Sequence, residues 1–183
     1  YDIMSKPFLF LTPLIIFVIL IVYLASGLNR NPQMLPNSLQ GMAAPMFSLP
    51  PIEGRDKIGF KNVHLLGNVS LINIFGSWCV ACKSEHSFLM YIKSKNLIQI
   101  HGIDWRELDR FSGPKWLKIY GDPYTYIGDD PASEAAIAFG VTGAPETFLI
   151  DKKGIIRYKH IGPINKEIWN AILWPMIQKL RQN

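Results

Sequence analysis

The chain has 183 residues, of which 49% are hydrophobic and 18% are charged, and its net charge is +5. This length is enough for one compact domain with its own core. The lysines and arginines are scattered, and the longest basic run is Lys152-Lys153, so we expect no nucleic-acid partner. Because the chain has only two cysteines, it is not a small domain held together by several disulfides.

An uncharged, strongly apolar run of 18 residues occupies positions 8–25. At a rise of about 1.5 Å per residue, a helix of this length crosses most of a bilayer core of roughly 30 Å. The alternative is a signal peptide that is cut near Ala25-Ser26-Gly27, where small residues suit a peptidase. We expect an uncleaved anchor, because the run is longer than the apolar core of a usual signal peptide. In either case the rest of the chain would be exported.

Proline recurs between residues 29 and 51, with Asn, Gln and Ser between the prolines. Such a composition is typical of an extended spacer. We therefore predict a membrane anchor over residues 1–28, a linker over 29–45 and one folded domain over 46–183.

Strand and helix patterns alternate through the domain. Residues 69–75 predict a buried strand, and residues 79–95 predict a helix with an apolar face. A strand is predicted next over 98–103, followed by two short helical pieces over 106–120 that are broken at Gly113-Pro114. A strand over 124–127 and a helix over 133–139 come after them. Strands over 147–150 and 155–160 are joined by a turn, and a last helix runs from Ile164 to Leu180 with a kink at Pro175. This order predicts an α/β fold with a mixed central sheet flanked by helices on both faces.

The pair Cys79 and Cys82 follows a predicted buried strand and opens a predicted helix. A helix N-terminus has free N–H groups and a partial positive charge, both of which favour a thiolate over a thiol. The pKa of Cys79 should therefore fall and its reactivity should rise. Cys82 lies one turn further along, where it can form a disulfide with Cys79 or resolve a mixed disulfide.

Two structural alternatives exist for this pair. A structural disulfide that closes so short a loop stabilises a fold little. A zinc site normally needs four ligands, but the four histidines are scattered and no second Cys-x-x-Cys is present. We therefore predict no metal and no cofactor beyond the redox-active disulfide itself.

Four segments of the chain resemble the thioredoxin superfamily and, within it, the cytochrome c maturation branch called CcmG or DsbE. They are residues 39–49, residues 78–86 around the cysteines, residues 140–151 with Gly-Ala-Pro-Glu-Thr-Phe at 143–148, and residues 154–160. The cysteine motif alone resembles any thioredoxin, whereas the stretch 143–148 is similar to this branch. The resemblance implies a thioredoxin-like fold and a thiol:disulfide oxidoreductase. Together with the apolar run of residues 8–25, it leads us to expect one N-terminal transmembrane helix followed by that fold.

The resemblance also implies that Pro145 is a cis-proline that faces the cysteines. A cis bond would turn the Ala144 backbone toward the disulfide, where a substrate strand could pair with it. The alternative is an ordinary trans-proline at the start of an edge strand. Trp78 would cover Cys79 and shape docking, or it is a partly buried packing residue.

Many members of the superfamily have a buried Asp at the position of Asn73, and an Asn cannot exchange a proton at neutral pH. The resemblance to an acidic active site makes Glu85 and Glu146 candidates for tuning the pKa of Cys82, because a nearby carboxylate raises a thiol pKa. Glu85 follows Cys82 by about one turn. The alternative for Glu85 is a solvated helix face.

From the resemblance, the expected substrate is apocytochrome c or a heme-lyase component with a Cys pair, and the electron donor is a membrane protein of the DsbD or CcdA type. The expected location is the inner membrane, held by residues 8–25 as a single pass, with the catalytic domain on the periplasmic side. The alternatives are a general exported disulfide reductase or oxidase, and a redox-inert holdase for apocytochrome.

Overall fold

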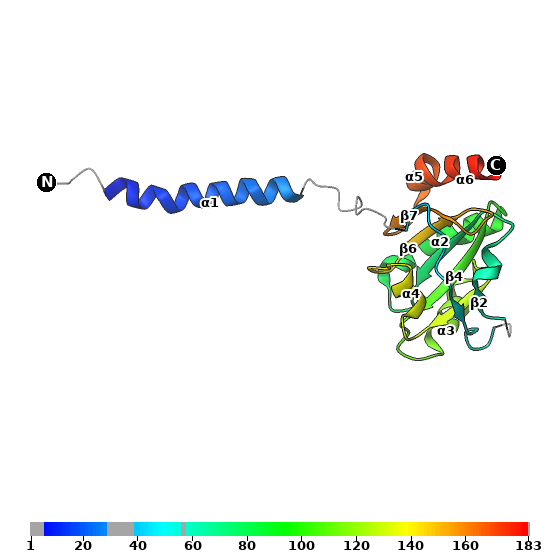
Figure 1. The fold of residues 1–183 in the computed structure, drawn as a ribbon. Coiled ribbons are helices and arrows are strands. Elements are labelled where there is room, and N and C mark those ends of the chain that lie inside the picture. The colour runs from blue at the N-terminus through cyan, green and yellow to red at the C-terminus, as the bar shows by residue number, and fades with distance from the viewer. Residues whose placement is uncertain (1–5, 29–38, 56–57, 183) are drawn as a thin grey trace. The chain divides into compact units, whose positions relative to one another are not determined.

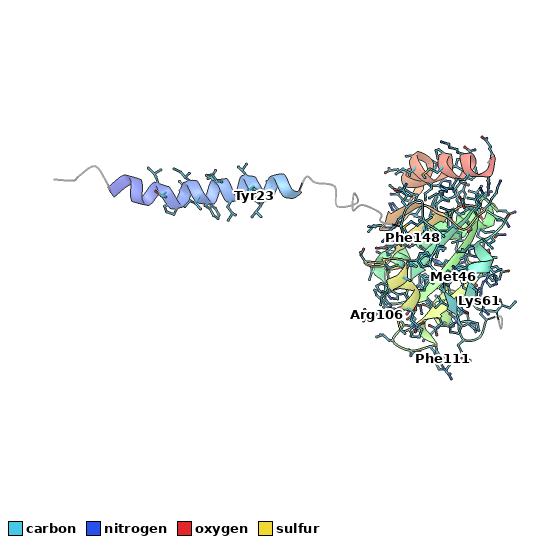
Figure 2. All side chains as sticks on the ribbon, in the orientation of Figure 1. Tyr23, Met46, Lys61, Arg106, Phe111 and Phe148 are labelled. Carbon is cyan, nitrogen blue, oxygen red and sulfur yellow. A yellow bond between two sulfur atoms is a disulfide. The ribbon has the colours of Figure 1, made fainter. Side chains whose placement is uncertain are left out.

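The computed structural model describes residues 6–28, 39–55 and 58–182, and the side chains of the first helix over residues 11–25 (Figure 1). The chain divides into two compact units, Tyr1–Pro36 and Asn37–Asn183. In the first unit, α1 spans Lys6–Leu28 and contains Pro13. Its large apolar side chains are exposed from Leu11 to Leu24, and Tyr23 is labelled among them in Figure 2. Within the described residues, no helix combines the length and apolarity of a membrane-spanning helix.

The second unit is built on a five-stranded sheet with the order β5-β4-β3-β6-β7. Its strands are β3 (Ser70–Phe75), β4 (Gln99–Trp105), β5 (Ile127–Asp130), β6 (Glu146–Ile150) and β7 (Ile156–Ile161). β3 pairs in parallel with β4, and β4 with β5. β6 runs antiparallel to both β3 and β7. The predicted mixed sheet is therefore confirmed, with β3 at its centre.

Helices cover both faces of this sheet, as predicted. On one face, the apolar core joins Leu71 of β3 to α2 (Val80–Ser94), α3 (Ser112–Tyr120) and the C-terminal helical segment. On the other face, a second core joins Ile72 and Phe148 to α4 (Glu134–Ala138) and to the two short strands β1 (Ser48–Leu49) and β2 (Phe60–Lys61). The central strand alternates between the two cores and is buried along its whole length, because both of its faces are covered.

The sequence patterns missed β1, β2 and the 3-10 helix η1 (Asn62–Leu65), since strands of two residues are too short to show a period. The domain also begins earlier than the predicted boundary at residue 46. Residues 41–44 run along the start of β7, where Gly41 N donates to Ile156 O and Ala44 N donates to Gly154 O. That part of the predicted linker belongs to the folded unit.

The prediction of two helical pieces over 106–120 was wrong. A single helix, α3, begins at Ser112 and contains both Gly113 and Pro114 in its first turn. The first backbone N–H groups of a helix have no partner within it, so a proline there breaks no hydrogen bond.

The strand predicted over 124–127 is displaced, because β5 runs over Ile127–Asp130. Tyr124 is buried on the face that carries α2, and Thr125 N donates to Ile100 O, so the segment approaches β4 before the regular ladder begins. The apolar pattern marked burial at Tyr124 rather than the start of the strand.

The last helical segment is made of α5 (Lys166–Ile168), the π-helical turn η2 (Trp169–Leu173) and α6 (Trp174–Gln182). Asn165 caps its start by accepting a hydrogen bond from Ile168 N. Ile164, which the pattern placed in the helix, lies just before it. Pro175 follows the π-helical turn, and an irregularity at this position is the expected consequence of a proline that cannot donate.

Candidate functional site

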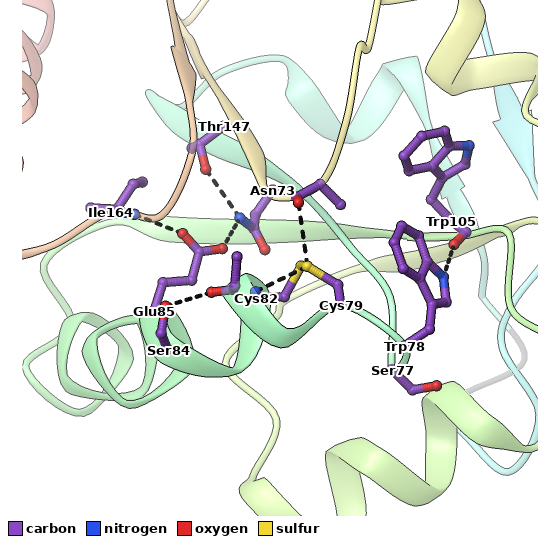
Figure 3. The surroundings of a disulfide bond; sticks show 12 residues. Asn73, Ser77, Trp78, Cys79, Cys82, Ser84, Glu85, Trp105, Thr147 and Ile164 are labelled. Carbon is purple, nitrogen blue, oxygen red and sulfur yellow. Dashed lines mark hydrogen bonds between the residues drawn. A yellow bond between two sulfur atoms is a disulfide. The ribbon is translucent and has the colours of Figure 1, made fainter.

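The two cysteines lie where the central strand passes into α2. Cys79 is the N-cap residue of α2, and its sulfur accepts a hydrogen bond of 3.0 Å from Cys82 N. Cys79 and Cys82 are joined by a disulfide with a Cα–Cα distance of 5.2 Å (Figure 3). A backbone N–H and the positive end of the helix therefore face the Cys79 sulfur, and both stabilise negative charge on it.

The surroundings of the two cysteines differ. Cys79 is 5% exposed and Cys82 is 1% exposed, while the intervening Val80 is 85% exposed. Cys82 is enclosed by the core that α2 covers, whereas Cys79 is the less enclosed sulfur at the end of the helix. A second molecule therefore has better access to Cys79.

The peptide bond between Ala144 and Pro145 is cis, as the resemblance led us to expect. The Ala144 carbonyl oxygen lies 3.4 Å from the Cys79 sulfur. In the disulfide this approach is a contact only, because the sulfur carries no proton, whereas a reduced thiol at the same place can donate to that oxygen. The loop before β6 thus meets the start of α2, and it brings residues that are 65 positions apart together at the sulfur.

Beneath the disulfide, Asn73 lies at the centre of a buried polar network. Its side-chain nitrogen donates to Glu85 Oε1 at 2.8 Å and to Thr147 Oγ1 at 3.0 Å. Its side-chain oxygen accepts from the Tyr124 hydroxyl at 2.7 Å. Every polar atom of the Asn73 side chain thus has a partner, which is what a fully buried amide requires. Tyr124 was not among the predicted site residues, since an isolated tyrosine has no pattern that marks it.

Glu85 is 1% exposed, so the alternative of a solvated helix face is wrong. Its second carboxyl oxygen accepts a hydrogen bond of 2.8 Å from Ile164 N (Figure 3). Burial raises the pKa of Glu85 to about 7, and the hydrogen bonds from Ile164 and Asn73 oppose that rise. Glu85 is therefore a carboxyl group that changes charge near neutral pH, one helical turn beyond Cys82.

Glu146 is buried but lies on the opposite face of the sheet. It stands opposite Ile74 in the pairing of β3 with β6, whereas Thr147 stands opposite Asn73. Its carboxyl group forms an ion pair of 2.8 Å with Lys159, and Thr142 N donates to it at 2.9 Å. The structure does not bring Glu146 together with Glu85 and Asn73.

Trp78 is 43% exposed and lies beside the cysteines. Its indole nitrogen donates to Trp105 O at 3.0 Å, and the two indole rings meet edge to face (Figure 3). The preceding residue, Ser77, donates to Glu107 from both its backbone and its hydroxyl. The sequence patterns missed Trp105 and Glu107, because both lie on a segment that only the pairing of β4 with β3 brings to the site.

In the described part of the chain, no three His, Cys, Asp or Glu side chains come together in a way that could hold a metal ion. The disulfide between Cys79 and Cys82 is a group at this site that can undergo redox chemistry.

Comparisons with known proteins agree along almost the whole chain. The Redoxin family matches residues 39–173. The thiol:disulfide interchange protein DsbE of Allochromatium vinosum is 39% identical over 169 residues, which are 92% of each chain. The protein of the same name in Escherichia coli is 34% identical, with 92% of this chain and 93% of that protein covered.

Solved structures show the same fold. A protein of Neisseria meningitidis described as a thioredoxin is 29% identical and superposes with a TM-score of 0.64, over 76% of this chain and 90% of that one. A secreted thiol-disulfide isomerase of Corynebacterium glutamicum, 21% identical, gives a TM-score of 0.61 over 74% and 85% of the two chains. The cysteine pair, the fold and these relatives lead to one conclusion: the chain is a thiol:disulfide oxidoreductase of the redoxin family, in the CcmG/DsbE branch of the thioredoxin superfamily.

Proposed function

We propose that this chain is exported and reduces disulfides of apocytochrome c, or of a heme-lyase component with a Cys pair, during cytochrome c maturation. The observation that carries the proposal is the Cys79–Cys82 disulfide at the start of α2 against cis-Pro145, in a chain that matches DsbE proteins over most of its length. Haem attachment needs free thiols, and an exported compartment oxidises thiols, so a dedicated reductant has a purpose there.

In the proposed reaction, reduced Cys79 attacks one sulfur of the partner's disulfide as a thiolate. A mixed disulfide forms, and the other partner sulfur leaves as a thiolate that takes up a proton. Cys82 then loses its proton and attacks Cys79, so that the Cys79–Cys82 disulfide forms and the second partner sulfur is released. The second partner sulfur also takes up a proton. Counted from the dithiol form, in which Cys79 has not yet lost its proton, the enzyme loses two electrons and two protons, and the partner gains them.

Asn73 and Glu85 have different parts in this scheme. Asn73 cannot accept the proton that Cys82 loses, because an amide does not titrate. Glu85 can accept it, since burial raises its pKa to about 7 and it lies one turn from Cys82 on the same helix. We assign Glu85 the role of tuning Cys82 and Asn73 the role of holding the Glu85 carboxyl in place. For Glu146 we propose a structural role in place of the predicted tuning role, because its charge is paired with Lys159 on the other face.

The partner's chain would dock across Ala144, Pro145 and Trp78. The Ala144 carbonyl oxygen lies 3.4 Å from the Cys79 sulfur, and Pro145 has no N–H to satisfy. A backbone N–H of an extended substrate segment can donate to that carbonyl in the manner of an added strand. Trp78 contributes an exposed aromatic surface beside the sulfur.

Residues 8–25 would hold the enzyme in the inner membrane by a single pass, with the domain on the periplasmic side. The uncharged run and the exposed apolar side chains of α1 from Leu11 to Leu24 support this proposal. Each catalytic cycle leaves the cysteines oxidised, so the enzyme needs an electron supply. A membrane reductant of the DsbD or CcdA type fits, since it would deliver electrons at the surface where the domain is held.

The decisive experiment measures haem attachment to c-type cytochromes in a strain that lacks this gene. We expect attachment to be lost, to return with the wild-type gene or with an added thiol reductant, and not to return with Cys79→Ser. Normal attachment in the deletion strain would show that the proposed pathway is wrong, even if thiol exchange itself persists.

A trapping experiment tests the assignment of the two sulfurs. Cys82→Ser should accumulate a mixed disulfide between Cys79 and its partner, because the resolving thiol is absent. Mass spectrometry of the trapped complex would identify the partner. Reduction of a partner disulfide by Cys79→Ser would show that Cys79 is not the nucleophile.

The alternative functions predict different experimental results. A reduction potential near that of thioredoxin, about −270 mV, favours a reductant, whereas a value near −120 mV favours an oxidant. A redox-inert holdase would support haem attachment even when both cysteines are changed to Ala.

A further inference from the structure

Another buried carboxyl group lies at the end of β4, next to the strand that leads to the cysteines. Asp104 is 1% exposed and stands opposite Phe75 in the pairing of β3 with β4. The first turn of α3 closes over it: a methyl group added to Gly113 would lie 1.8 Å from Asp104 Oδ2. Its other oxygen, Oδ1, is buried without a hydrogen-bond partner among the described residues. A carboxyl oxygen that is buried without a hydrogen-bond partner strongly disfavours the ionised form of the group.

Glu107 links Asp104 to the active-site turn. Its Oε1 accepts a hydrogen bond of 2.5 Å from Ser77 N, and its Oε2 accepts one of 2.6 Å from Ser77 Oγ. Two oxygens that both accept are typical of an ionised carboxylate. The Glu107 side chain also interacts with Asp104 and contributes to raising the pKa of Asp104, and two carboxyl groups can share a hydrogen bond only through a proton. Because both Glu107 oxygens accept hydrogen bonds from Ser77, we place the proton of such a pair on Asp104.

The charges around this pair agree with that placement. Burial is the main cause that raises the pKa of Asp104 to about 9, and Glu107 and Asp129 add to it. Asp129, on β5, has its own pKa raised by burial and by the charges of Asp130 and Glu107. Burial also raises the pKa of Tyr124 well above the usual value, and the charges of Glu85 and Asp104 add to that rise. The groups that act on Asp104 are acidic, so they favour its protonated form.

The turn that Glu107 holds leads directly into Cys79. Cys79 N donates to Gly76 O at 3.1 Å, which places Cys79 at the N-cap of α2. Beside it, Trp78 donates to Trp105 O, so the end of β4 and the residues after it hold two successive residues of the turn. A shift of this turn would move the Cys79 sulfur away from the backbone N–H that faces it.

We propose that Glu107, held by a protonated Asp104, is a positioning residue that fixes the turn at Ser77 and thereby keeps Cys79 in its reactive geometry. This inference rests on the proposed role of Cys79 as the attacking thiol. The pair acts through Ser77 and touches neither the sulfur nor the substrate. When Asp104 ionises, two carboxylates face each other, Glu107 withdraws, and the turn loses its two hydrogen bonds.

The experiment measures the alkylation rate of Cys79 in the reduced full-length protein, with mass spectrometry to identify the modified cysteine. At pH 7 we expect Glu107→Gln and Ser77→Ala each to slow the reaction by about fivefold, the effect of losing one hydrogen bond that orders the site. Loss of charge alone would give a different pattern: Glu107→Gln would speed the reaction, and Ser77→Ala would leave it unchanged. That pattern would overturn the proposal. Glu134→Gln, on the exposed start of α4, is the control for a change of charge at a distance.

The alkaline behaviour tests Asp104 itself. The amide resonance of Ser77 in an NMR titration should shift with a midpoint near pH 9 in the wild-type protein. In Asp104→Asn it should not shift, because the amide donates to Glu107 and cannot ionise. An unchanged midpoint in Asp104→Asn would overturn the proposal. Alkylation of Cys82 in place of Cys79 would show that the proposed function assigns the wrong nucleophile. That result differs from a failure of the positioning role, in which Cys79 is still the alkylated residue.

Discussion

The side-chain amide of Asn73 donates a hydrogen bond of 2.8 Å to Glu85, so a neutral residue and a carboxyl group share the buried position beneath the disulfide. Asn73→Asp would place two carboxyl groups in contact there. One of them must then stay protonated at neutral pH, since two ionised carboxylates cannot share a buried site. We expect a destabilisation of about 1–3 kcal/mol that is larger at pH 8 than at pH 5. The alkylation profile of Cys82 should shift to higher pH.

Urea unfolding at the two pH values measures the first effect. Asn165→Asp is a matched control, because Asn165 is an exposed N-cap at which Asp is equally suitable. Equal destabilisation by Asn73→Asp at both pH values would show that the new carboxyl group is not in contact with Glu85.

Glu85 makes stability depend on pH in a definite direction. Its pKa in the folded protein is about 7, above the usual value of 4.5, so the folded state holds a proton that the unfolded state has lost between these values. Stability should therefore fall as pH rises from 4.5 to 7, by about 3 kcal/mol in total. Glu85→Gln should lack this fall.

Urea titrations of the oxidised protein at a series of pH values test this prediction. The difference between wild type and Glu85→Gln isolates Glu85 from other titrating groups. Glu167→Gln, at an exposed position on α5, should follow the wild-type curve. Parallel curves for wild type and Glu85→Gln would contradict the prediction.

His101 should make the domain sensitive to acid. It is fully buried between the rings of Phe60 and Tyr126, and neither of its ring nitrogens has a hydrogen-bond partner among the described residues. Burial lowers the pKa of His101 to about 4, so the unfolded state binds a proton first as pH falls. Its contribution to stability is present above pH 6.5 and is lost toward pH 4, by about 3 kcal/mol.

His101→Leu keeps a similar volume and cannot titrate, so its stability should decline less between pH 6.5 and pH 4. Thermal unfolding of the oxidised protein across this interval would measure the difference. The same decline in both proteins would indicate that other groups cause the acid sensitivity.

On the face of the sheet opposite Asn73, Glu146 and Lys159 form an ion pair that balances their charges. The Lys159 side chain is 8% exposed and that of Glu146 is fully buried. Lys159→Met would leave Glu146 without its partner cation, at a cost of about 3–5 kcal/mol. Adding Glu146→Gln to that variant should restore most of the stability. A double-mutant cycle by urea unfolding measures the coupling, and additive effects would argue against a direct pair.

The Cys82 alkylation profile in Glu146→Gln provides a second, independent readout. We expect it to match the wild-type profile, since Glu146 faces away from Asn73 and α2. A clear shift would return Glu146 to the tuning role that the acidic character of the family implies.

Much of the fold was accessible from local patterns. The strand that became β3, the helix that begins at Cys79 and the hairpin of β6 and β7 were predicted because each has a clear apolar period and a clear end signal. The errors fell where local rules are ambiguous. Pro114 breaks a helix in its interior but suits its first turn, and only the backbone hydrogen bonds decide which case applies.

The sequence by itself located the chemistry of this protein at Cys79 and Cys82, because two cysteines one helical turn apart at a helix start can form a disulfide and be reduced again. The tertiary structure alone decided which acids lie near that pair. Glu85 and Glu146 were equivalent candidates in the chain, but the alternation of side chains along β6 places one on the far face, while α2 places the other beneath the sulfurs. Only the tertiary structure also brings Asp104, Glu107 and Tyr124 close to the active-site region. Strand pairing and burial set their surroundings, and no sequence pattern encodes these.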